Sequence, residues 1–154
     1  MTIASEQINH WLKEIDSSLS LNNQGKVFIS SESGVEIVIA SLNDSGHVLI
    51  NSDIRTIPEA NKQHLFAKAL ELNLYQDKTM GGSISVDPVS NKMCLSFTQQ
   101  VEFLDSTLFQ NTLQNIITLT NDLKSLLSGL ELDDSPTNAD RSTGTSNSPN
   151  ALFV

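Results

Sequence analysis

The fold is decided between Pro58 and Phe97, where the sequence reads Ala69-Leu70-Glu71-Leu72-Asn73, then Gly81-Gly82-Ser83-Ile84-Ser85-Val86-Asp87-Pro88, then Met93-Cys94-Leu95-Ser96-Phe97. The apolar spacing before Asn73 predicts a short amphipathic helix. The alternation after Gly82, with a turn at Ser90-Asn91, predicts a β-hairpin. This stretch contains no nucleophile–base pair, no metal-ligand cluster and no phosphate loop. It therefore favours binding of a partner over catalysis.

The helix in this stretch is predicted to begin at Thr56-Ile57-Pro58-Glu59, because Thr and Glu have the spacing of a capping box. Asn73 suits the residue just after the helix, since Asn tolerates the left-handed conformation. The apolar residues of this helix cover a face of ~160°. We expect one part of that face to pack on the chain's own sheet and another part on something else. The apolar residues that form this face are Leu65, Phe66, Ala69, Leu70 and Leu72.

The region before Thr56 predicts one helix and three strands. The apolar stripe that includes Ile8 and Leu12 predicts a helix over Ser5–Leu19. Apolar runs separated by short Gly-containing turns predict antiparallel neighbours. The expected strands are Lys26–Ser30, Val35–Leu42 and His47–Asn51.

The region after Gly82 predicts a hairpin over Gly82–Phe97, with its second strand reaching as far as Leu104. Asp105 or Ser106 then caps a helix that runs to about Leu127 or Gly129, because apolar residues cover about half of its surface. The expected fold is α+β, in the order α-β-β-β-α-β-β-α, with a twisted, mainly antiparallel sheet and helices packed on it.

The chain of 154 residues consists of two regions that differ in composition. Residues 1–132 are predicted to form one domain. Residues 133–154 are rich in Ser, Thr, Asn, Pro and Gly, and we expect a disordered polar tail. The tail ends in the apolar run Ala151-Leu152-Phe153-Val154. Such a run is either a short docking motif or incidental, and the latter is the commoner case.

The net charge of −9 argues against nucleic-acid binding, because an acidic surface repels phosphate backbones. No apolar run approaches the ~20 residues of a membrane span. The single cysteine, Cys94, excludes an internal disulfide and suits a reducing compartment. The first residues show no basic region ahead of an apolar one, so no secretory signal is predicted. We expect a cytoplasmic protein.

No residue is nominated for catalysis, for metal binding or for a cofactor. His10, His47 and His64 lie on separate predicted elements, and none has a partner at metal-ligand spacing. Cys94 is expected to be a buried structural thiol, because no activating base lies near it in sequence. Gly81-Gly82 lacks the residues of a phosphate loop and is typical of the entry to a hairpin.

The order of elements resembles the class I type III secretion chaperones, the Tir-chaperone-like family. The segment Leu65–Asn73 is similar to the second helix of that family and its Leu-x-x-Asn ending. Gly82-x-Ile84-x-Val86-Asp87-Pro88 is similar to its Gly-x-x-Leu-x-Leu-Asp strand and turn, and Lys92–Phe97 to the partner strand. The long last helix and low pI also match. The first helix lacks the common Gly-Leu ending, and the tail is longer than usual.

The resemblance implies a cytoplasmic bacterial homodimer that holds the N-terminal region of a cognate effector in extended form, soluble and ready for export. It implies no enzymatic activity and no cofactor, and it makes the secretion ATPase, a separate protein, a further candidate partner. An extended effector segment can add a strand to a sheet edge and place alternate side chains in apolar pockets.

Two sets of residues are the candidates for these contacts. The predicted effector-binding surface is formed by the first helix and the first two strands, a region with more apolar residues than one sheet face needs. Its candidate residues are Val27, Ile29, Ile37, Val38 and Ile39. The predicted dimer interface uses the wide apolar face of the second helix: Leu65, Phe66, Ala69 and Leu70. Two alternatives stay open, namely a dimeric α+β adaptor or regulatory protein that binds a folded partner, and a small enzyme with a cryptic site.

Overall fold

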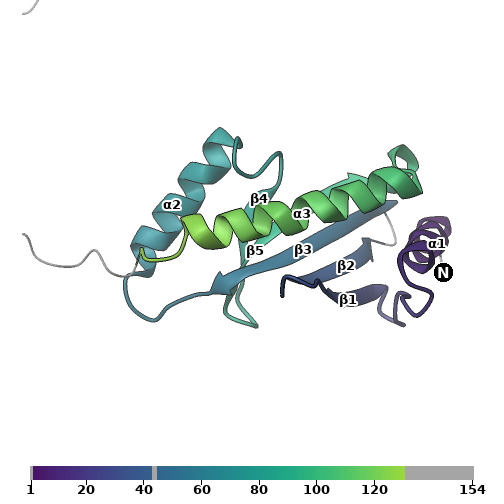
Figure 1. Ribbon diagram of the computed structural model, residues 1–154, viewed down its shortest axis with the longest axis horizontal. Coiled ribbons are helices and arrows are strands. Elements are labelled where there is room, and N and C mark those ends of the chain that lie inside the picture. The colour runs from purple at the N-terminus through teal and green to yellow at the C-terminus, as the bar shows by residue number, and fades with distance from the viewer. Residues whose placement is uncertain (1, 43–44, 131–154) are drawn as a thin grey trace, which may run out of the picture.

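The structure is a computed structural model that describes residues 2–42 and 45–130 (Figure 1). The element order confirms the expected α+β fold. The elements are α1 (Ile3–Ile15), β1 (Lys26–Ser30), β2 (Glu36–Leu42), β3 (His47–Thr56), α2 (Lys62–Tyr75), β4 (Ser83–Asp87), β5 (Lys92–Gln100), the 3-10 helix η1 (Val101–Phe103) and α3 (Ser106–Leu126). The predicted tail, residues 133–154, lies outside the described residues.

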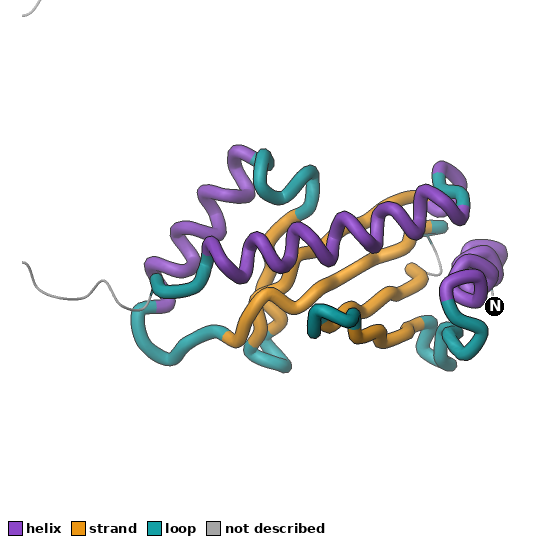
Figure 2. Tube along the Cα trace, in the orientation of Figure 1, coloured by secondary structure: helices purple, strands orange, loops and turns teal. Residues whose placement is uncertain are grey.

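The five strands form one antiparallel sheet in the order β1-β2-β3-β5-β4. Short turns join β1 to β2 and β2 to β3, whereas α2 carries the chain from β3 over to β4 at the far edge (Figure 2). The strands β1 and β4 are therefore the two edges. In Figure 1, α3 runs across the sheet, with α2 near one of its ends and α1 near the other.

Alternation along the strands separates a covered face from an open one. Ile37 and Ile39 are 2% and 0% exposed and lie in the core with residues of α1 and α3. Phe28 points to the opposite face of the sheet and is 66% exposed. Because side chains alternate along a strand, β1 and β2 each contribute to both faces.

The core consists of two apolar clusters that share the partly buried Phe97. The larger cluster joins α1, α3 and the first three strands, and within it the rings of Trp11 and Phe109 lie 5.2 Å apart. The smaller cluster joins α2, β4, β5, the end of β3 and the end of α3, and Leu65 within it is 1% exposed. The helix α3 contributes to both clusters and so ties them together.

Two predicted boundaries were wrong because polar side chains form hydrogen bonds that the apolar pattern does not show. The predicted helix Ser5–Leu19 begins at Ile3 and ends at Ile15. It ends there because the Asp16 carboxylate accepts hydrogen bonds from the Ser18 backbone N–H and hydroxyl, which offers the chain an alternative to the helix. The third strand extends beyond Asn51 to Thr56. Its buried alternation continues through Ser52, whose hydroxyl lies 2.5 Å from the Thr120 hydroxyl.

The predicted ends of the second helix were also wrong. The helix α2 begins at Lys62, because Thr56 belongs to β3 and the Ile57 N–H donates to the Asn91 carbonyl. It continues past Asn73 and stops before Gln76, which adopts the left-handed conformation (φ 55°). The Asn73 side chain accepts from the Ile84 N–H at 2.7 Å and donates to the Ile84 carbonyl at 3.0 Å. Asn73 therefore joins α2 to β4 and does not end the helix.

The last strand ends at Gln100, earlier than the predicted Leu104, because the chain enters η1. The helix α3 then begins as expected, with the Asp105 carboxylate accepting from the Leu108 N–H at 2.7 Å. This cap satisfies one of the free N–H groups at the helix start.

Candidate functional site

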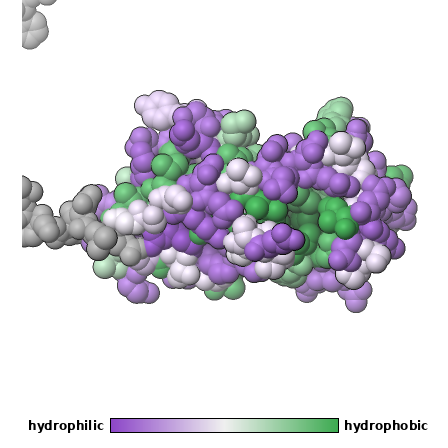
Figure 3. Space-filling model, viewed as in Figure 1, coloured by the Kyte–Doolittle hydropathy of each residue, from purple (hydrophilic) through white to green (hydrophobic). Residues whose placement is uncertain are grey.

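A groove of about 240 Å³ lies between α3 and the first two strands. We call it the edge groove. Apolar side chains from four elements form it, with two glutamine side chains beside them: Ile15, Ile29, Ile37, Leu113, Ile117, Gln110 and Gln114. Figure 3 shows apolar surface gathered in a hollow beside α3, towards the end of the molecule where α1 lies.

Polar contacts of α3 bound this groove along the helix. At the start of α3, the Ser106 hydroxyl donates to the Glu14 carboxylate of α1. Further along, the Asn121 side-chain amide donates to the Ser33 hydroxyl, in the turn between β1 and β2, at 3.2 Å. The groove residues of α3 lie between these two contacts. The helix is therefore tied on both sides of an apolar opening.

The free edge of β1 lies beside this groove. The strand β1 pairs with β2 alone. At Lys26 the outer backbone groups are already bonded, since its N–H donates to the Asn22 side chain and its carbonyl accepts from the Asn22 N–H. Because backbone groups alternate between the two sides of a strand, Phe28 and Ser30 direct theirs to the same outer side. An extended segment can therefore pair with β1 at Phe28 and Ser30.

The structure brings together only part of the predicted effector-binding set. Ile29 and Ile37 line the edge groove. Val27 and Ile39 are 7% and 0% exposed, within the larger core cluster. Val38 pairs with Phe28 and lies with it on the open face of the sheet. The assignment of these residues to effector binding stays a prediction.

The predicted surface included the first helix but did not name Ile15, and the groove residues of α3 were not among the predicted contacts. Ile15 is 43% exposed, and Ile117 is a partly buried residue at the margin of the core. One feature of the sequence pointed to the α3 residues. Apolar positions cover about half of the surface of this helix, which is more than packing against one sheet requires. The packing of α3 against β1 and β2 is needed to see that the surplus forms a groove.

The predicted dimer residues divide between the inside and the outside of the protomer. Leu65 and Ala69 are 1% and 5% exposed and pack in the smaller core cluster, with Phe66 partly buried against it. Leu70 is 68% exposed. Other exposed apolar residues on or just after α2 form, with Leu70, a set that we call the α2 patch: Leu70, Leu74, Tyr75 and Met80. Their role in a dimer stays a prediction.

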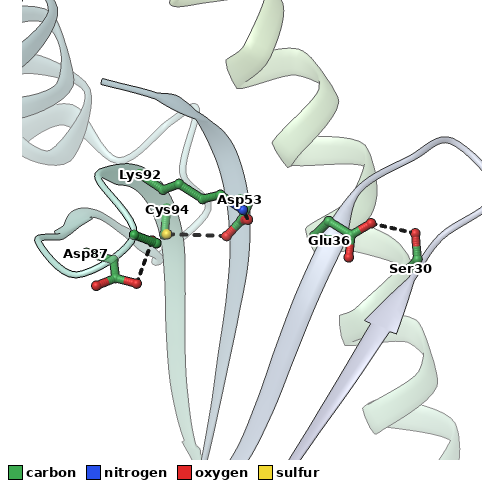
Figure 4. Close-up of polar contacts among 7 residues, drawn as sticks. Ser30, Glu36, Asp53, Asp87, Lys92 and Cys94 are labelled. Carbon is green, nitrogen blue, oxygen red and sulfur yellow. Dashed lines mark hydrogen bonds and ion pairs between the residues drawn. The ribbon is translucent and has the colours of Figure 1, made fainter. Parts of the chain in front are cut away.

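Cys94 is buried as expected, at 6% exposure, and its thiol donates to the Asp53 carboxylate at 3.6 Å (Figure 4). Burial, together with the negative charge of Asp53, raises the pKa of Cys94 to about 12. The same carboxylate accepts a hydrogen bond from Lys92 and raises the pKa of that ammonium. The cysteine is therefore a neutral thiol at physiological pH and is not an activated nucleophile.

The native chain is accordingly expected to resist alkylation of Cys94. With a pKa of about 12, the thiolate fraction at pH 8 is about one part in ten thousand. We expect iodoacetamide to modify the folded protein at least ~100-fold more slowly than the protein in denaturant, where the thiol regains an ordinary pKa. Mass spectrometry over a time course measures both rates. Comparable rates in the two states would contradict this description of the Cys94 site.

Neither a metal site nor a membrane span is found in the part of the chain that the structure describes. Within residues 2–42 and 45–130, no three His, Cys, Asp or Glu side chains form a group that could hold a metal ion. Over the same residues, every helix is too short or too polar to cross a membrane.

Comparison with solved structures shows the same fold in proteins of low sequence identity. A chain of the ExsC–ExsE complex is 20% identical, with a TM-score of 0.71, over 82% of this chain and 97% of that chain. A chain of the HopA1–SchA chaperone–effector complex is 12% identical, with a TM-score of 0.61, over 78% and 91%. A chain of the heterodimeric ExoU–SpcU complex from the type III secretion system of Pseudomonas aeruginosa is 17% identical, with a TM-score of 0.60, over 79% and 98%.

No curated protein matches the sequence. The model of the Tir chaperone protein (CesT) family, by contrast, matches residues 6–124, which include all of the sheet and nearly all of α3. This match confirms the resemblance of the sequence to type III secretion chaperones, and the chain belongs to the Tir chaperone protein (CesT) family.

Proposed function

We propose that this chain is a type III secretion chaperone that binds the N-terminal region of a cognate effector in extended form and keeps it soluble and competent for export. The family match supports the chaperone class. Two of the structural relatives belong to complexes described as chaperone–effector or type III secretion complexes. The observation that carries the proposal within this chain is the edge groove beside the free backbone groups of β1.

The geometry of the groove suits an extended peptide. A strand added to β1 receives backbone hydrogen bonds at Phe28 and Ser30, and alternate side chains of the added strand point toward the groove. The apolar lining from Ile29, Ile37 and Ile117 accepts apolar effector residues. The net charge of −9 favours an effector segment with basic residues between the apolar ones. Capture then occurs by burial and strand pairing.

The remaining properties that we propose follow from the family. The protein acts in the bacterial cytoplasm as a homodimer, with the secretion ATPase as a further partner. It has no catalytic activity of its own and requires no cofactor. Release of the effector by the purified protein alone on addition of ATP would overturn this part of the proposal.

Isolation of the protein with its natural partner tests the function directly. The protein is purified from native cytosol, and the bound partner is subjected to limited proteolysis with and without the chaperone. We expect protection of a continuous stretch near the partner's N-terminus, while its downstream domains fold and are digested as usual. A partner that binds only as a folded domain would support the alternative adaptor function and would contradict the proposal.

Amide hydrogen exchange on the same complex locates the site. We expect slower exchange in β1 and in the groove residues of α3, from Gln110 to Ile117, when the effector is bound. The backbone groups of Phe28 and Ser30 are the most informative, because a paired strand protects them and a helix seated in the groove does not. Protection confined to α2 or β4, with Val27–Ile39 unchanged, would mean that the effector binds elsewhere.

The domain division leads to a separate prediction about stability. We propose that residues 1–132 contain everything the fold requires, because apolar residues are almost absent from 133 to 150. A chain shortened to end at Leu132 is expected to melt within a few degrees of the full-length protein, as measured by circular dichroism. A loss of stability of many degrees would show that the fold depends on residues 133–154.

A further inference from the structure

Backbone pairing and the edge groove leave the register of an effector strand on β1 open. Side chains alternate between the two faces of a strand, so a slip of one residue turns the apolar residues out of the groove. A slip of two residues, by contrast, keeps every side chain on its face and repeats the same backbone hydrogen bonds. Selection between registers two residues apart therefore requires a feature that changes along β1.

The open face of the sheet carries opposite charges at the two ends of β1. Lys26 begins the strand, is exposed, and lies on the same face as Phe28 and Ser30. At the other end of the strand, Ser30 is directly opposite Glu36 of β2, so the Glu36 side chain also lies on the open face. A strand added to β1 therefore runs past a cation at one end and past a carboxylate at the other.

The Glu36 carboxylate is turned toward the free edge of β1. It accepts a hydrogen bond from the Ser30 hydroxyl at 2.7 Å, and Figure 4 shows the two side chains pointing toward each other. Further across the same face, the Lys92 ammonium donates to the Asp53 carboxylate. Lys92 is therefore held by Asp53, and the negative charge of Glu36 faces the edge to which an effector strand adds.

A cation on the effector strand can reach this carboxylate from the position opposite Ser30. Neighbouring strands lie about 4.8 Å apart, so about 10 Å separates an added strand from β2. The long stem of a Lys or Arg side chain, together with the Glu36 side chain, spans that distance, and the small Ser30 leaves the path clear. After a slip of two residues the same cation lies opposite Phe28, where Lys26 is a diagonal neighbour of like charge.

We propose that Glu36 determines specificity at the effector site by forming an ion pair with a Lys or Arg that the bound strand places opposite Ser30. The adjacent effector residue then lies opposite Ile29 and points an apolar side chain into the edge groove. The preferred effector segment thus carries a cation directly next to an apolar residue. The cation precedes the apolar residue in an antiparallel strand and follows it in a parallel one. This role of Glu36 rests on the effector-binding function proposed above.

A double-mutant cycle between the protein and a labelled peptide tests the ion pair. The probe is a fluorescein-labelled peptide of the partner stretch that is protected in limited proteolysis, with each Lys or Arg beside an apolar residue replaced in turn by Gln. We expect Glu36→Gln to weaken binding of the unaltered peptide about threefold, as is usual for an exposed ion pair. One of the Gln peptides is expected to bind the variant and the wild type equally. The amide oxygen of the variant still accepts from the Ser30 hydroxyl, so the fold is retained.

Two further variants separate a local ion pair from the field of the whole protein. Glu102→Gln removes the same charge from η1 and is expected to change binding by less than about 1.5-fold. Glu36→Lys is expected to weaken binding of the unaltered peptide roughly tenfold, because two like charges then meet. Replacement of the identified peptide cation by Glu is expected to restore most of that loss, since the two charges are again opposite.

The outcomes distinguish failure of this inference from failure of the proposed function. Equal binding of the unaltered peptide to Glu36→Gln, Glu102→Gln and the wild type would overturn the role of Glu36. If the Phe28 and Ser30 amides are still protected in those complexes, strand addition stands. A Glu36→Lys loss that no charge-exchanged peptide recovers would also contradict the ion pair. A wild-type protein that binds no extended peptide, or binds one without protecting those amides, would overturn the proposed site and this inference together.

Discussion

Replacement of Ile29 by Ser is expected to weaken effector binding by roughly 30-fold. Ile29 lines the edge groove, and most of the apolar area that it offers to a bound segment is lost in the variant. Burial of such a side chain contributes ~2 kcal/mol, and 1.4 kcal/mol corresponds to a factor of about ten in Kd. Titration of a labelled effector peptide by fluorescence anisotropy measures the change.

The adjacent residue supplies a matched control, since Phe28→Ser removes an apolar side chain from the same strand. Phe28 points to the open face of the sheet and is 66% exposed. If the effector lies in the edge groove, Phe28→Ser binds within about threefold of the wild type, while backbone pairing at Phe28 is retained. A large loss with Phe28→Ser and none with Ile29→Ser would place the effector on the open face.

Loss of stability in the Ile29 variant must be separated from loss of binding. Ile29 also touches the larger core cluster as a partly buried residue. A moderate drop in melting temperature is therefore expected, and the titration is performed well below it. Binding that recovers fully when the temperature is lowered would attribute the effect to unfolding and would contradict a contact at Ile29.

Two substitutions in α2 are expected to differ greatly in their effect on protomer stability. Leu65→Asp places a carboxylate in the smaller core cluster, where Leu65 is 1% exposed, and is expected to unfold the protomer. The cost of an unpaired buried charge exceeds ~4 kcal/mol, a large share of the stability of a small domain. Leu70→Asp alters an exposed position of the α2 patch and is expected to change protomer stability by no more than ~0.5 kcal/mol.

The second substitution tests the proposed homodimer. If the α2 patch forms an isologous contact, Leu70→Asp buries two like charges near the twofold axis and dissociates the dimer at a cost of several kcal/mol. Light scattering and circular dichroism, measured on the same samples, should show a folded monomer. A wild-type protein that is already monomeric at micromolar concentration, or a Leu70→Asp dimer of unchanged stability, would contradict a contact through this patch.

Local chemistry in the sequence determined most of the elements. Strand β1 was predicted with its observed bounds, Lys26–Ser30, because a short β-branched and aromatic run between polar turns leaves little choice. Asp105 caps α3 as expected, since its carboxylate needs only the N–H group three residues later. Cys94 was predicted to be a buried thiol because no activating base lies near it in sequence, and it is 6% exposed. Each of these signals acts over a few residues, and a single sequence displays it directly.

Contacts between distant residues decided the rest. Thr56 resembles a helix cap but pairs with Lys92 in the sheet. Asn73 resembles a helix end but bonds to Ile84. The third strand looks finished at Asn51, because the buried Ser52 is polar and its partner Thr120 is 68 residues away.

The candidate site depended on such contacts most of all. Ile29 and Ile39 look alike in the sequence, yet one lines the edge groove and the other is fully buried. The difference arises from the position of each strand in the sheet order and from where α3 crosses it. An apolar residue serves the core or a partner according to what packs over it, and only the tertiary structure determines that.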